Sequence, residues 1–87
     1  MKVYKVTICT PFVGEKRVEY LSIPNDKNIT DIHYRDFIFN LRCEVAIAAW
    51  HLHKDTYPEY HEFFQEITYT IEDFTKEYYE RGCVVPQ

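Results

Sequence analysis

Glycine, paired cysteines and long apolar runs are all scarce in this sequence, and each shortage excludes a class of protein. Only two of the 87 residues are glycine and no Gly-rich phosphate loop is present, so we expect no nucleotide site of that type. Cys9, Cys43 and Cys83 are odd in number and form no Cys-x-x-Cys pair, which is typical of reduced thiols. The longest apolar run, residues 45–50, is far shorter than the roughly 20 residues of a membrane-spanning helix.

A signal-peptide core and an excess of basic charge are also missing. The amino-terminal residues lack the apolar stretch of about 7–15 residues that directs secretion, so we expect a cytoplasmic protein with no membrane contact. The chain contains ten basic and fourteen acidic residues, which gives a net charge of -4. Nucleic-acid-binding domains normally present a basic stripe, and direct nucleic-acid binding is therefore not expected.

What the sequence does contain is enough apolar material for one domain. Hydrophobic residues make up 46% of the chain and aromatic residues 17%, and a chain of this length has room for a single core. Neither a linker nor an internal repeat interrupts it. We therefore expect one compact domain over 1–87.

The amino-terminal third is predicted to form a β-hairpin. Residues 3–13 alternate apolar and mixed side chains, which is typical of a half-buried strand. Gly14 lies in the turn, and residues 17–23 are rich in β-branched and aromatic side chains that favour a returning strand. In this second strand the apolar positions change parity, which indicates a bulge or two partly covered faces.

Two long helices are predicted to follow. The first should run over 30–54, with Thr30 as its cap, and it is apolar on nearly all sides, so it should be covered on two faces. Pro58 breaks the chain, and a second helix should run from there to about Arg81, ahead of Gly82. The short connection favours antiparallel packing.

The predicted fold is therefore α+β, with a hairpin packed on an antiparallel pair of long helices in the order ββαα. The valines at 84 and 85 would allow a short third strand near the carboxyl terminus.

The strongest charge pattern falls on the predicted second helix. Residues 55–87 contain eight acidic and two basic residues, and most of these acids recur at intervals of three or four, which would align them on one helix face. Like charges at this spacing repel by roughly 0.2–0.5 kcal/mol per pair, so the pattern costs stability. Two explanations stay open: a solubilising face, or a docking surface for a basic protein. The predicted partner-binding residues are Glu59, Glu62, Glu66, Tyr69, Asp73, Glu77 and Glu80.

For function, this pattern favours a non-enzymatic protein-binding module whose acidic face binds a basic partner, such as a nucleic-acid-handling protein. In size, acidity and lack of catalytic motifs the chain resembles small inhibitors from phages and mobile elements, such as anti-CRISPR and anti-restriction proteins. The likeness is one of composition and carries no residue role across. It implies an inhibitor of a host defence or nucleic-acid enzyme.

Two alternatives belong to other classes. One is a small-ligand-binding or sequestering protein, with a pocket lined by Tyr20, Trp50 and a histidine. The other is a structural homodimer or adaptor, joined through an edge strand or through Phe39, Ile47 and Trp50 on the second apolar face of the first helix.

Catalytic and metal-binding patterns are weak. His51, His53 and His61 lie close in sequence, but residues two apart on a helix point to different faces and do not bind one ion together. Cys9 and Cys43 occupy positions that the periodicity assigns to packing. We therefore expect no catalytic residue, no metal and no cofactor.

Overall fold

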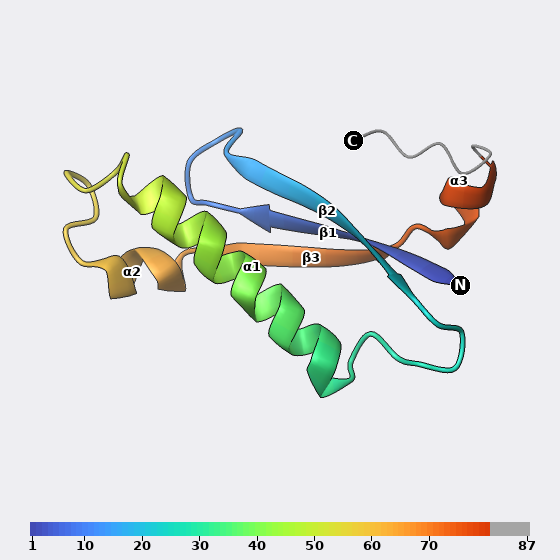
Figure 1. Cartoon of the computed structure of the whole chain (residues 1–87). Helices are drawn as coiled ribbons and strands as arrows, with labels where there is room; N and C mark the ends of the chain where they lie inside the picture. Colours follow the sequence, from blue (N-terminus) through green and yellow to red (C-terminus); the bar gives the residue numbers. More distant parts are fainter. Residues whose placement is uncertain (81–87) are drawn as a thin grey trace.

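The computed structural model describes residues 1–80 as a three-stranded antiparallel sheet with one long helix across one face (Figure 1). The α+β class and the hairpin are confirmed, while the pair of long antiparallel helices is wrong. No helix among the described residues is long and apolar enough to cross a membrane. The elements are β1 (Lys2–Cys9), β2 (Lys16–Ile23), α1 (Ile32–Trp50), α2 (Tyr60–Gln65), β3 (Thr68–Asp73) and α3 (Thr75–Glu80).

Strands β1 and β2 form the predicted hairpin. Each residue from Lys2 to Cys9 has a partner in β2, so no bulge interrupts the pairing. Gly14 adopts a φ of 86° in the connecting turn, a conformation that other residues reach only with strain. Because directly opposed residues share a face, the change of parity in β2 reflects two partly covered faces: Leu21 lies on the α1 side and Tyr20 on the other.

Helix α1 begins two residues later than predicted and ends at Trp50 rather than near residue 54. The hydroxyl of Thr30 donates to Asn28 Oδ1 at 2.9 Å instead of capping the helix. Its two apolar faces are covered only in part by residues 1–80, and Phe39 and Ile47 remain 51% exposed. One face packs on the sheet, and the other meets α2, where the Phe39 and Phe64 rings lie 5.9 Å apart.

The core lies between α1, α2 and the α1 side of β1. A cluster of fully buried apolar side chains closes this space, and burial of such side chains is the main source of stability. Its buried members are Val6, Ile8, Ile38, Leu41, Ala46, Phe63 and Ile67.

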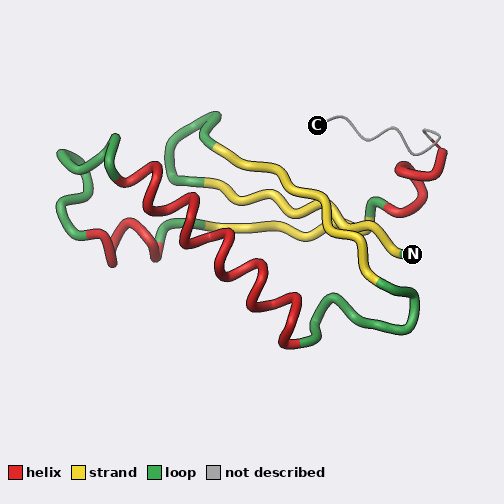
Figure 2. Tube along the Cα trace, in the orientation of Figure 1, coloured by secondary structure: helices red, strands yellow, loops and turns green. Residues whose placement is uncertain are grey.

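The predicted second long helix is the main error. Residues 58–81 instead form α2, then β3, then the start of α3, as the tube view shows (Figure 2). Residues 67–71 read Ile-Thr-Tyr-Thr-Ile, a β-branched and aromatic alternation that suits a strand better than a helix. Pairing with β1 also satisfies backbone groups that a two-stranded hairpin would leave open.

Strand β3 pairs antiparallel with β1, so the sheet order is β2-β1-β3 and the first strand of the chain is central. Thr75 fixes the end of this pairing, because its Oγ1 accepts a hydrogen bond from the Val3 amide at 2.8 Å. The third strand is therefore Thr68–Asp73, while the strand predicted at 84 and 85 lies outside the described residues.

Candidate binding groove

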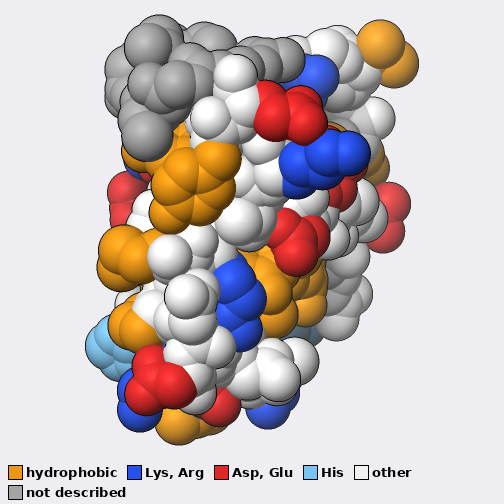
Figure 3. All heavy atoms as spheres, turned by 90° about the vertical axis from the view of Figure 1, so that its right-hand side faces the viewer, with side chains coloured by type: hydrophobic (Ala, Val, Ile, Leu, Met, Phe, Trp, Pro, Cys, Tyr) orange, Lys and Arg blue, Asp and Glu red, His pale blue; other side chains and the backbone are white. Residues whose placement is uncertain are grey.

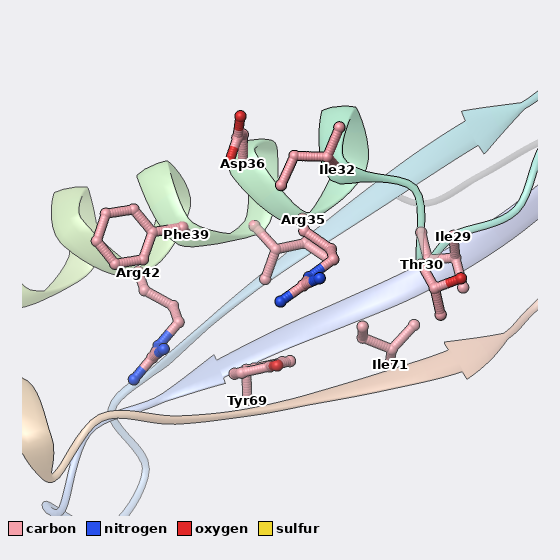
Figure 4. A pocket seen from close by; sticks show the side chains of 10 residues that line it. Ile29, Thr30, Ile32, Arg35, Asp36, Phe39, Arg42, Tyr69 and Ile71 are labelled. Atoms are coloured by element: carbon pink, nitrogen blue, oxygen red, sulfur yellow. The ribbon is translucent and has the colours of Figure 1, made fainter.

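A groove runs between α1 and the edge strand β3, with a volume of about 470 Å³ (Figure 4). It lies on the α1 side of the sheet, because Tyr69 and Ile71 are opposed by Ile8 and Val6, which belong to the core beneath the helix. Six of the ten lining side chains are apolar or aromatic. These are Ile29, Ile32, Ile38, Phe39, Tyr69 and Ile71.

Large apolar side chains remain exposed along this groove. Ile32 and Phe39 on the helix are 67% and 51% exposed, and Tyr69 and Ile71 on the strand are 46% and 38% exposed. Single exposed apolar residues are ordinary, but a contiguous group of them marks an interaction site. The described part of the chain leaves this group uncovered.

The outer edge of β3 borders the groove. Strand β1 occupies one side of β3, and no strand among residues 1–80 pairs with its other side. All six residues of β3 are exposed. A free edge of this kind presents unpaired backbone N–H and C=O groups that can pair with another extended chain.

Arg42 is held firmly at one end of the groove. Its Nη2 donates to the Ile67 carbonyl at 3.2 Å, and its guanidinium carbon lies 5.3 Å from the centre of the Tyr69 ring and 4.9 Å from that of Phe64. These contacts restrict the side chain through a hydrogen bond and cation–π attraction. The Arg42 Nε is buried and has no hydrogen-bond partner within residues 1–80.

Arg35 lies about two helical turns further toward the start of α1. Its side chain is directed into the groove toward Tyr69, whereas Asp36 points away from the strand (Figure 4). Within the described chain the Arg35 guanidinium makes no ion pair and no hydrogen bond. The groove therefore combines apolar walls, a free strand edge and two guanidinium groups, one of them unpaired.

The predicted acidic ridge is not one helix face. Its seven residues are divided among α2 with its two flanking positions, strand β3 and helix α3. Helices α2 and α3 lie at opposite ends of β3 (Figure 1). At the α3 end, acidic, basic and apolar side chains are interspersed on the surface (Figure 3). Asp73 accepts a hydrogen bond from the Thr75 amide at 3.0 Å, which holds the pKa of its carboxyl below the usual range. Tyr69 alone among the seven lines the groove.

The predicted dimer face is also divided. Phe39 belongs to the groove, and Ile47 is 51% exposed on α1. Trp50 is used inside the fold: its Nε1 donates to the Tyr57 carbonyl at 2.7 Å, and its ring lies 5.7 Å from that of Tyr60. The predicted ligand pocket does not form either, because Trp50 lies on the α1 side of the sheet, while Tyr20 is on the other face against Phe74.

The histidines do not converge. His53 Nε2 lies 2.7 Å from Glu15 Oε2, and Thr10 donates to the other oxygen of Glu15 at 2.8 Å. The His53 bond is the main cause that lowers the pKa of Glu15. His61 bonds to Gln65 instead, and residues 1–80 contain no group of three His, Cys, Asp or Glu side chains placed to hold a metal. The His53–Glu15 pair joins the hairpin turn to the end of α1.

The sequence patterns did not predict the groove, because its two walls come from segments far apart in the chain. One signal was available: Ile67, Tyr69 and Ile71 alternate with threonines, a strand pattern. Arg35 and Arg42 are seven residues apart, which places them on one side of a helix. Both have other charged residues close to them in sequence, so neither is conspicuous as a binding residue.

Comparisons with protein-family models, with curated proteins and with solved structures gave no match for this chain.

Proposed function

We propose that this protein is a protein-binding module that takes up an extended segment of its partner along the free edge of β3, beneath α1. The observation that carries the proposal is the position of that edge: it borders the groove of exposed apolar side chains on the same side of the sheet. Strand addition of this kind combines main-chain hydrogen bonds, which give affinity, with side-chain pockets, which give specificity.

The two edges of the sheet differ in this respect. No strand among residues 1–80 pairs with the outer edge of β2 either. Its α1-side residues Arg17 and Glu19 form an ion pair at 3.0 Å, and charged side chains of this kind protect an edge from pairing. Strand β3 presents Tyr69 and Ile71 at the equivalent positions. An incoming strand therefore buries apolar surface at β3 and disrupts a charged pair at β2.

A peptide array tests this proposal. The full chain is applied to an array of short random-sequence peptides, and the bound peptides are resynthesised for hydrogen–deuterium exchange. Bound peptide should slow exchange of the β3 amides and leave those of β2 unchanged, which makes β2 the internal control. An array without binders, or peptides that protect β2 or α3 instead of β3, would contradict the proposal.

A second candidate keeps the acidic residues as the docking surface. Glu59, Glu62 and Glu66 lie on and beside α2 and make no ion pair within the described chain. This free negative charge supports binding of a basic protein, such as a nucleic-acid-handling enzyme that the chain would inhibit.

Charge reversal separates the two candidates. Glu62→Lys with Glu66→Lys should abolish salt-sensitive binding of a basic partner and leave peptide binding at β3 intact. Array peptides rich in lysine that lose binding in this variant would favour the acidic surface, and unchanged lysine-peptide binding would exclude it.

A further inference from the structure

We infer that the segment bound in the groove is acidic and carries two carboxylates at alternate positions, paired with Arg35 and Arg42. This inference rests on the proposed function and goes beyond it by assigning the chemistry of the partner. It depends on two observations: the charge that the groove presents and the spacing of the two arginines along α1.

The charge of the groove is opposite to that of the whole chain. The chain has a net charge of -4, yet the groove is lined by two arginines and one acidic residue. The two guanidinium groups point from α1 toward β3, and the carboxylate of Asp36 is directed away from the strand (Figure 4). Arg35 has no counter-ion within the described residues. An unpaired guanidinium beside apolar walls favours an anionic ligand, because a planar fork of N–H donors matches a carboxylate.

Arg42 supplies a second, more rigid contact. Its Nη2 is engaged with the Ile67 carbonyl, and Tyr69 and Phe64 both lie against the guanidinium. A guanidinium has five N–H donors, so the bond to Ile67 leaves donors for a ligand. Because the group is already ordered, a carboxylate that binds there loses less conformational entropy than one that must order a free side chain.

The spacing of the arginines determines the pattern in the partner. Seven residues of α-helix cover about 10.5 Å, and α1 crosses the sheet at an angle (Figure 1), so the separation along the strand direction is shorter. Side chains on one face of an extended chain recur about every 6.8 Å. Carboxylates at positions i and i+2 therefore point to the same side and lie within reach of the two long arginine side chains. Neighbouring carboxylates point to opposite faces of the strand, and only one of them reaches the groove.

Three peptides of matched length test this pattern against the full chain by fluorescence anisotropy. The first has two glutamates separated by one valine, the second has the same composition with the glutamates adjacent, and the third has glutamines in place of both glutamates. We expect the first to bind about three- to tenfold more tightly than the other two, as one or two charge-assisted contacts would give. Raising the salt concentration should remove most of this difference.

Variants then assign the effect to the groove. Arg35→Glu should remove the preference for the first peptide, and it changes an exposed side chain without partners in the described chain, so folding is retained. Lys16→Glu makes the same change of charge in β2, at the edge of the sheet opposite β3, and should leave the preference unchanged. A peptide with one glutamate replaced by lysine should bind better to the Arg35→Glu variant than to the original chain.

The outcomes distinguish the two proposals. Equal binding of all three peptides, with β3 still protected from exchange, overturns the acidic pattern and leaves strand addition intact. If Lys16→Glu removes the preference for the first peptide as strongly as Arg35→Glu does, the effect follows from net charge alone. That result also overturns the assignment of the two carboxylates to Arg35 and Arg42. Failure of every peptide to protect β3 overturns strand addition itself.

Discussion

Two isoleucines distinguish the observed fold from the predicted long helix. On a helix over 58–81, Ile67 and Ile71 would share one apolar stripe and truncation of either would cost about the same. In the structure Ile67 is 2% exposed in the core, whereas Ile71 is 38% exposed on the floor of the groove. Ile67→Ala should therefore destabilise the protein far more than Ile71→Ala.

The expected magnitudes follow from burial. Removing a fully buried isoleucine side chain down to alanine costs about 2–5 kcal/mol, since the transfer term and the cavity term add. The exposed Ile71 fills no closed space, so its truncation should cost about 1 kcal/mol, including the lower strand preference of alanine. For a domain of this length the total stability is on the order of 4–13 kcal/mol, so the difference is measurable.

Urea unfolding, monitored by Trp50 fluorescence and by circular dichroism, gives the loss in unfolding free energy for each of the two variants. If Ile67→Ala unfolds at room temperature, Ile67→Val should still cost about 0.5–1.5 kcal/mol. Equal costs at the two positions, or a larger cost at Ile71, would refute the assignment of Thr68–Asp73 to an edge strand.

Three further predictions concern the ends of the hairpin and of α1. Gly14→Ala should cost about 1–2 kcal/mol in urea unfolding, because the residue sits at a φ of 86° although the space around it is open; a neutral result would contradict the left-handed turn. Trp50→Phe should lower the melting temperature, because the indole N–H bond to the Tyr57 carbonyl is worth about 0.5–1.5 kcal/mol, and an unchanged melting temperature would argue against that bond. His53 and Thr10 hold the pKa of Glu15 below its usual value of 4.5, so the ionised carboxylate stabilises the folded state above the unfolded pKa, and this contribution is lost as the pH falls through the folded pKa. The stability advantage over Glu15→Gln should therefore be present near neutral pH and disappear in acid, and an advantage independent of pH would exclude the pairing.

The amino-terminal half of the fold was predictable because its signals are local. Alternation over residues 3–13 and the glycine at 14 specify a hairpin, and the apolar periodicity of 34–52 specifies a helix. Part of the segment 60–78 fits both the period of a helix, 3.6 residues, and that of a strand, two residues. Its apolar positions fit a helical stripe, and residues 67–71 also fit a strand. The choice between helix and strand depends on the open edge of β1, whose residues pair with positions 59 to 69 further along the chain. A local sequence pattern carries no information on that edge.

The site was harder to predict than the fold for the same reason. The carboxylates after residue 55 are conspicuous in sequence, but their alignment required a continuous helix that does not exist. Arg35 and Arg42 are inconspicuous among the charges of α1 and gain meaning only when β3 lies beside that helix. The contact of Trp50 with Tyr60 likewise depends on α2, which covers part of the second apolar face of α1 and leaves Phe39 and Ile47 half exposed.

The most direct test of strand addition is a nuclear magnetic resonance measurement of the peptide-bound protein. The glutamate–valine–glutamate peptide is added to the isotopically labelled full chain, and intermolecular contacts between backbone protons are recorded. Contacts from the peptide backbone to Thr68–Asp73, with side-chain contacts to Arg35, are the predicted result. Peptide contacts confined to β2 or α2, with none to β3, would contradict the account.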